Sequence, residues 1–134
     1  MANGTITTIT ELDRSTYKTK IYSGGHFIYS DEPENLGGTD EGMTPGALLL
    51  ASLGSCTAIT IRMYADRKKI ALDFITIELE ICNEEEMSAQ TSINRKISLK
   101  GDLTSDEHTR LLEIADKCPI HKMLSNPIVI NTMK

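Results

Sequence analysis

Hydrophobic and polar positions alternate in strand-like fashion through the N-terminal third of this chain. Residues 5–10 mix Thr with Ile, a β-branched composition typical of a strand. Residues 17–22 and 26–29 flank the pair Gly24-Gly25, which predicts a β-hairpin with a tight turn. A loop rich in Gly, Asp, Glu and Pro follows over residues 31–43. Loops of this length in compact domains are usually functional or mobile.

The longest apolar segment predicts a buried helix from Pro45 to about Lys69. Thr44 suits the N-cap position and Pro45 the first helical position. The apolar run over residues 47–61 is too short and too often interrupted by Ser, Gly and Thr to span a bilayer, so we expect no membrane association. The helix is apolar on nearly every side, and one chain offers few strands to cover it. We therefore expect a second copy of the chain to cover the rest. The small residues along the helix would admit either a packed helix or a substrate; they are Ala51, Ser52, Gly54, Ser55 and Ala58.

The C-terminal half predicts two paired strands, two helices and a last strand. Residues 75–82 alternate apolar and polar side chains, with Cys82 on the polar side, and an acidic connection over residues 83–90 leads to a partner strand over residues 93–99. Thr104 and Glu107 form a capping box that begins a helix. Pro119 ends that helix and begins a short one, which makes Cys118 its N-cap. Residues 128–130 predict the last strand. This order predicts an α+β fold with antiparallel sheet, in a single domain over residues 1–134.

Composition and charge exclude several classes of function. The chain has 134 residues and a net charge of −5, so we expect no nucleic-acid partner. Residues 1–10 are polar and lack the apolar stretch of a secretory signal. Three cysteines, an odd number, argue against a secreted disulfide framework. We therefore expect a reducing, cytoplasmic compartment, in which a cysteine pair would serve redox chemistry.

Two cysteines occupy special backbone positions. Cys56 lies within the apolar helix, and Cys118 lies where one helix ends and the next begins. Such a pair could cycle between dithiol and disulfide. A helix N-terminus favours a thiolate, whereas an aliphatic setting raises the pKa of a thiol, so the local sequence favours Cys118 as the thiolate. The alternative is that either cysteine is an inert part of the core, the commoner role of a single buried cysteine.

Other chemistries find little support in the motifs. Cys118 and His121 form half of a zinc site, but no second closely spaced ligand pair accompanies them. The glycines at 37, 38 and 42 lack the spacing and the lysine of a phosphate-binding loop. Residues 54–56 lie within a predicted helix and not at the strand-to-helix turn of a serine hydrolase. We therefore expect neither a metal nor an organic cofactor. The zinc ligands that the half-site would need could come only from Cys56, Cys82, His26 and His108.

Several segments resemble the OsmC/Ohr family of thiol peroxidases. The similar segments cover residues 39–45, 48–57, 62–68 and 111–121, and both cysteines are in register with the family's cysteine motifs. The resemblance implies an OsmC-like fold, with antiparallel sheets wrapped around long central helices in an intertwined homodimer. It implies reduction of organic hydroperoxides in oxidative-stress defence, with Cys56 as the peroxidatic thiol and Cys118 as the resolving thiol. An external dithiol would then reduce the Cys56–Cys118 disulfide.

The sequence departs from the family at one position that bears on activity. The family commonly carries an acidic residue just after the helix-opening proline, which helps to hold an activating arginine. Here Gly46 and Ala47 follow Pro45. Two outcomes are open: a substitute or unanchored cation from the N-terminal third, with Arg14, Lys18, Lys20 and His26 as the candidates, or a Cys56 pKa near the reference value of about 8.5. The same departure favours the alternative function, a non-enzymatic or weakly active dimer that senses redox state or binds a small molecule.

Overall fold

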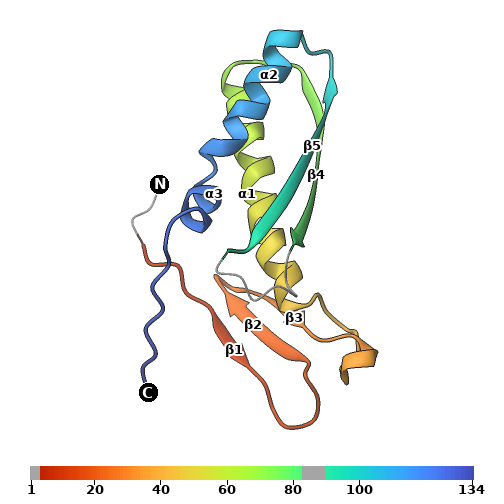
Figure 1. The fold of residues 1–134 in the computed structure, drawn as a ribbon, viewed down its shortest axis with the longest axis vertical. Coiled ribbons are helices and arrows are strands. Elements are labelled where there is room, and N and C mark those ends of the chain that lie inside the picture. Colours follow the sequence, from red (N-terminus) through yellow and green to blue (C-terminus); the bar gives the residue numbers. More distant parts are fainter. Residues whose placement is uncertain (1–3, 83–89) are drawn as a thin grey trace. The chain divides into compact units, whose positions relative to one another are not determined.

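A computed structural model of the chain describes residues 4–82 and 90–134, and it has the expected mixture of helices and antiparallel sheet (Figure 1). The described chain divides into two compact units, one ending at Leu49 and the other beginning at Leu50. The first unit holds a three-stranded antiparallel sheet in the order β1-β2-β3. Its elements are β1 (Ile9–Glu11), β2 (Thr19–Ser23), β3 (His26–Ser30) and the short 3-10 helix η1 (Glu34–Leu36).

The predicted hairpin is confirmed. Gly24 and Gly25 connect β2 to β3 with φ angles of 57° and 82°. Positive φ at both central residues is the geometry of a two-residue hairpin turn, which glycine adopts without steric cost. The strand predicted at residues 5–10 is shorter and later, because pairing with β2 begins only at Ile9.

The loop over residues 31–43 is held by a buried carboxylate. Asp31 is 1% exposed, and it accepts hydrogen bonds from the backbone N–H groups of Glu32 at 2.7 Å and Glu41 at 3.1 Å. The hydroxyl of Thr39 donates to the same carboxylate at 2.5 Å. These bonds, that from Thr39 foremost, lower the pKa of Asp31 to about 2. The carboxylate therefore stays ionised at neutral pH. Its hydrogen bonds order the loop, although a loop so rich in Gly, Asp, Glu and Pro has few other means of holding one conformation.

The second unit contains most of the long helix and everything that follows it. The elements are α1 (Pro45–Arg67), β4 (Leu72–Cys82), β5 (Ser92–Gly101), α2 (Ser105–Ile114), the 3-10 helix η2 (Ala115–Lys117) and α3 (Pro119–Leu124). The Thr44 hydroxyl accepts a hydrogen bond from the backbone N–H of Ala47 at 3.2 Å, as expected of an N-cap. The capping box of Thr104 and Glu107 is also present. These helix starts confirm the sequence predictions.

The hydrophobic core of the second unit joins α1, the β4–β5 hairpin and α2 (Figure 1). The β4–β5 pair is antiparallel, and its inward side chains come from the alternating positions predicted from the sequence. Leu79 of β4 approaches α1 so closely that a Cβ at Gly54 would lie 2.9 Å from it. Packing against the sheet therefore explains this small residue. The buried members of the core are Ile61, Ala65, Leu72, Leu111, Ile114 and Ala115.

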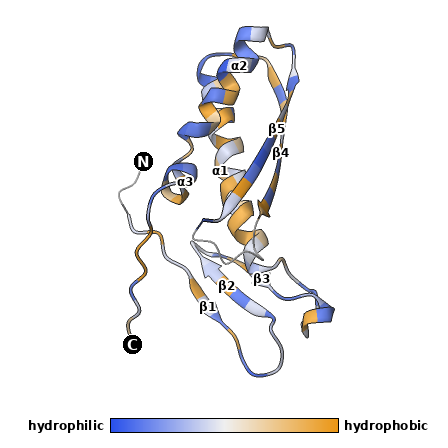
Figure 2. Cartoon of the chain, viewed as in Figure 1, coloured by the Kyte–Doolittle hydropathy of each residue, from blue (hydrophilic) through white to orange (hydrophobic). Residues whose placement is uncertain are grey.

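Much of the apolar surface of α1 is uncovered in a single chain. By length and composition alone α1 could cross a membrane, but the core helix of a soluble protein passes the same test, and α1 contributes Ile61 and Ala65 to the core. Only 17% of its most apolar window is buried. Ile59 and Met63 are 52% and 64% exposed. Figure 2 shows hydrophobic residues along this helix.

One predicted strand is wrong. Residues 128–130 form no strand, and Val129 and Ile130 are 81% and 85% exposed. A strand needs a neighbour for its backbone hydrogen bonds, and the described sheets consist of β1–β3 and of β4 with β5. A local run of β-branched residues is therefore not sufficient to make a strand. In the acidic connection predicted over residues 83–90, residues 83–89 lie outside the described part of the chain.

Candidate active site

Cys118 is buried at the start of α3. Its exposed fraction is 0%, and its backbone has φ −59° and ψ 127°, outside the helical region. The backbone N–H of His121 donates a hydrogen bond to its Sγ at 3.4 Å, so the thiol caps the helix as predicted. Pro119 occupies the first helical turn, where its missing N–H costs no hydrogen bond. This setting favours the thiolate form of Cys118.

Cys56 lies in the middle of α1 and is half-buried. Leu53, three residues before Cys56 on the same helix, and Thr57, the residue after it, are both buried. α1 continues through this position, so the backbone amides around Cys56 are engaged within the helix. α1 itself therefore offers Cys56 no free N–H group, although the backbone N–H of Ile120 in α3 bonds both cysteine sulfurs.

The fold brings the sulfur atoms of Cys56 and Cys118 within hydrogen-bonding reach of each other. Burial and the hydrogen bond with Cys118 raise the pKa of Cys56. Burial is also the largest influence on Cys118 and acts to raise its pKa. The hydrogen bonds from Cys56, from the backbone N–H groups of His121 and Ile120 and from Thr57 outweigh it, so the pKa of Cys118 is lowered. The two thiols ionise as a pair, and the geometry favours Cys118 as the site of the negative charge, because Cys118 caps α3 whereas Cys56 lies within α1.

This charge distribution agrees with the ranking drawn from the local sequence, in which Cys118 is the thiolate. The roles implied by the family resemblance, Cys56 attacking and Cys118 resolving, remain predictions. Cys82 lies on β4, where the side-chain amide of Asn94 donates to its Sγ at 3.2 Å.

Arg95 on β5 was not anticipated as a functional residue. Its Nη1 donates to the hydroxyl oxygen of Thr57 at 3.0 Å, and its Nη2 donates to Asp116 at 3.0 Å. Nη2 also lies 3.1 Å from Nδ1 of His121. The signal was present in the sequence, because Arg95 occupies the inward register shared by Ile93 and Ile97. A charged residue at an inward strand position calls for buried partners.

The cations proposed from the N-terminal third all belong to the first unit. Lys18 pairs with Glu41 at 2.9 Å, and the ammonium of Lys20 lies 4.4 Å from the ring centre of Phe27. These contacts occupy both lysines within their own unit. That Arg14, Lys18, Lys20 or His26 activates Cys56 stays a prediction, whereas Arg95 belongs to the unit that contains both cysteines.

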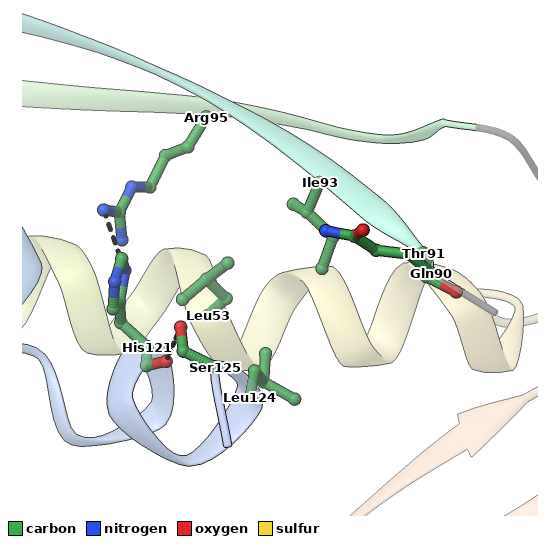
Figure 3. Close-up of a pocket in the computed structure, with 8 residues that line it drawn as sticks. All are labelled: Leu53, Gln90, Thr91, Ile93, Arg95, His121, Leu124 and Ser125. Carbon is green, nitrogen blue, oxygen red and sulfur yellow. Dashed lines mark hydrogen bonds between the residues drawn. The ribbon is translucent and has the colours of Figure 1, made fainter. Parts of the chain in front are cut away.

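A pocket of about 690 Å³ adjoins this network (Figure 3). Arg95 and His121 form one end, where their side chains point toward one another. Leu53, Leu124 and Ile93 supply apolar surface along the rest. Such a combination suits a small organic molecule with a polar end. Within residues 4–82 and 90–134, no group of three or more His, Cys, Asp or Glu side chains is arranged to hold a metal ion.

Comparison with known proteins places these features in context. The sequence profile of the family described as OsmC-like protein matches residues 38–133. No match was found among curated proteins. The fold is similar to that of an OsmC-like protein from Mycoplasma pneumoniae, with a TM-score of 0.77 at 19% identity, covering 92% of this chain and 89% of that one.

Two further solved structures are similar and carry functional names of their own. One is an organic hydroperoxide resistance protein OsmC from Legionella pneumophila, with a TM-score of 0.67 at 19% identity, covering 92% of this chain and 91% of the other. The second is an organic hydroperoxide resistance protein from Elizabethkingia anophelis, with a TM-score of 0.65 at 19% identity, covering 91% and 89% of the two chains. At these identities the likeness establishes a shared fold.

Proposed function

Because this chain belongs to the OsmC-like protein family, we propose that it is a cysteine-based peroxidase that reduces organic hydroperoxides in oxidative-stress defence. The observation that carries the proposal is the hydrogen-bonded pair of Cys56 and Cys118. A thiol and a thiolate within hydrogen-bonding reach of each other are placed to form a disulfide on oxidation. The names of the similar proteins from Legionella and Elizabethkingia support the choice of organic hydroperoxides.

The proposed reaction has three balanced steps. The sulfur of Cys56 attacks the terminal oxygen of the hydroperoxide, the O–O bond breaks, and the alcohol leaves with a proton, which gives Cys56 sulfenic acid. The sulfur of Cys118 then attacks the Cys56 sulfur, and water is released as the disulfide forms. An external dithiol reduces the disulfide and is itself oxidised. This chemistry needs no metal or organic cofactor. It fits a reducing, cytoplasmic compartment, which we propose as the location.

Exposure supports Cys56 as the attacking thiol. Cys56 is half-buried, whereas Cys118 is 0% exposed, which favours Cys56 as the residue that a hydroperoxide meets first. The buried Cys118 is suited to the second step, in which its only partner is Cys56. The pocket beside Arg95 and His121 offers apolar surface for the organic part of the substrate.

Peroxide oxidation and peptide mapping test the proposal. One equivalent of cumene hydroperoxide should produce a Cys56–Cys118 disulfide within one chain, with Cα atoms no more than about 7 Å apart. With a dithiol such as dithiothreitol present, the protein should consume many equivalents. A dominant disulfide that contains Cys82 would contradict the assignment.

A second candidate function is a redox sensor or small-molecule-binding protein with little turnover. The raised pKa of Cys56 favours it, because a protonated thiol attacks peroxide slowly. So does the sequence Pro45-Gly46-Ala47, which has no carboxylate to hold an arginine. Formation of the disulfide in one turnover, without sustained consumption when dithiol is in excess, would identify this function.

We further propose that the protein is a homodimer. Ile59 and Met63 expose apolar surface on α1, and a second copy is the partner that the family fold implies. Interfaces that cover a core helix commonly bury more than roughly 2,000 Å². We expect sedimentation at low micromolar concentration to show a dimer with no folded monomer. A stable folded monomer would refute the intertwined arrangement.

A further inference from the structure

Arg95 is a nearly buried cation that contacts two neighbours of the cysteine pair, Thr57 and His121. Its side chain is 13% exposed, and Asp116, which partly balances its charge, is 70% exposed. The exposed carboxylate is screened by water, whereas the contacts of Arg95 with Thr57 and His121 lie deeper in the protein. The positive charge is therefore available to the groups around Cys118.

Thr57 provides the first connection. It is 0% exposed and follows Cys56 in α1. Its hydroxyl accepts the hydrogen bond from Arg95 at 3.0 Å and donates to the carbonyl oxygen of Leu53 at 2.7 Å. A threonine hydroxyl has a single proton, which it can give to the Leu53 carbonyl or to the Cys118 sulfur. The hydrogen bond from Arg95 polarises that hydroxyl and makes it a stronger donor to a thiolate.

His121 provides the second connection. Its backbone N–H donates to Cys118, and its ring nitrogen Nδ1 lies 3.1 Å from Nη2 of Arg95. Arginine can only donate, so Nδ1 accepts this hydrogen bond in the tautomer that carries its proton on Nε2, and the Asp116 carboxylate lies 3.9 Å from the same Nδ1. The contact fixes the first turn of α3, and with it the N–H group that caps Cys118. The charged and titratable groups of this cluster are Cys56, Arg95, Asp116, Cys118 and His121.

We propose that Arg95 is a positioning residue of the cysteine pair, which through Thr57 and His121 holds the negative charge of the pair on Cys118, so that Cys118 serves as the base for Cys56. The role of Cys118 as a base for Cys56 rests on the proposed peroxidase function. The lowered pKa of Cys118 and the raised pKa of Cys56 agree with it. In this chain Gly46 and Ala47 provide no carboxylate to hold an activating arginine near the start of α1. Arg95 supplies the positive charge instead.

The proton movements balance. As Cys56 attacks the hydroperoxide, its proton passes to the Cys118 sulfur, and the departing alkoxide takes that proton to become the alcohol. Cys118 is then again a thiolate, beside a Cys56 sulfenic acid. It attacks the Cys56 sulfur, and the hydroxide that leaves takes a proton from solvent. One buried sulfur therefore acts first as base and then as nucleophile.

Titration of the thiols tests the inference without any peroxide. In a Cys82→Ala background, ultraviolet absorbance of the thiolate follows the first ionisation of the pair as pH rises. We expect Arg95→Met to raise the midpoint of this ionisation by about one pH unit. At pH values below the midpoint, the thiolate fraction should then fall by about tenfold. Arg110→Met is the matched control. It removes an arginine that pairs with Tyr64 and Glu113 on the surface, so its titration should be unchanged.

Substitutions at Thr57 keep the test decisive if Arg95→Met does not fold. Thr57→Val keeps the shape but removes the hydroxyl, and should shift the ionisation upward. Thr57→Ser keeps the hydroxyl, so its ionisation should match that of the parent. Equal titrations for Thr57→Val, Thr57→Ser and the parent would overturn the inference, and so would a folded Arg95→Met with an unshifted titration.

The outcome is separable from that of the proposed function. If the titrations shift while the parent consumes no hydroperoxide, Arg95 holds the charge on Cys118 and the peroxidase proposal fails. If the parent turns over hydroperoxide while the titrations stay fixed, the role of Arg95 is wrong and the peroxidase stands. When both hold, the rate of Cys56 sulfenic acid formation in Arg95→Met should fall about tenfold at neutral pH and recover as pH rises.

Discussion

Replacement of Cys56 by alanine is expected to lower organic hydroperoxide consumption by roughly a thousandfold or more, because loss of a nucleophile removes the covalent route entirely. The remaining Cys118 sulfur is 0% exposed and cannot readily reach a substrate. The measurement is steady-state consumption of cumene hydroperoxide with excess dithiol. Cys82→Ala is the matched control, since Cys82 lies on β4 with Asn94 as its described partner, and it should retain the parent rate.

The Cys118→Ala variant should fail in a different way. Cys56 can still be oxidised, but no second thiol resolves the sulfenic acid. We expect about one equivalent of hydroperoxide to be consumed per chain, more slowly than in the parent, and a sulfenic acid that dimedone can trap on Cys56. If instead Cys56→Ala retained one turnover and Cys118→Ala none, the two cysteines would have exchanged roles.

The largest expected loss of stability follows from Leu111→Ala. Leu111 of α2 is 0% exposed and belongs to the core cluster with Ile61 and Leu72. Truncation of a fully buried leucine leaves a cavity and typically costs about 2–5 kcal/mol in the free energy of unfolding. Urea unfolding followed by circular dichroism measures this loss, with the protein concentration held constant.

The adjacent residue supplies a matched control. Leu112 is 37% exposed on the same helix, so Leu112→Ala removes the same atoms from a site that already contacts water. We expect it to cost less than about 1 kcal/mol. Equal losses for the two variants would show that the packing of α2 differs from the one described here.

Local interactions explain why many elements were predictable from the sequence. The hairpin follows from Gly24 and Gly25, which accept positive φ without cost. The start of α2 follows from a capping box complete within four residues, from Thr104 to Glu107. Cys118 caps α3 because the proline after it both ends one helix and begins the next. In each case the groups that decide the conformation are close neighbours in the chain.

Residues 128–130 show the limit of such reasoning. Their β-branched composition predicts a strand, yet they remain outside the described sheets, because a strand also requires a distant partner with free backbone groups. Likewise, the apolar character of α1 was visible in the sequence, but its buried stripe of Leu53, Thr57, Ile61 and Ala65 emerged only from packing.

The sequence by itself determined most of the kinds of element and the two special cysteine positions, and the family resemblance predicts the pairing of the two cysteines. Only the tertiary structure decided which groups surround that pair. Arg95 is far from both cysteines along the chain, and its position depends on the β4–β5 register and on how α1 packs against that hairpin. Charge on Cys118 depends in turn on Cys56, Thr57 and His121 meeting at one point. Electrostatic interactions act over a few ångströms in space, whatever the separation in sequence, so folding must bring these groups together before their chemistry is set.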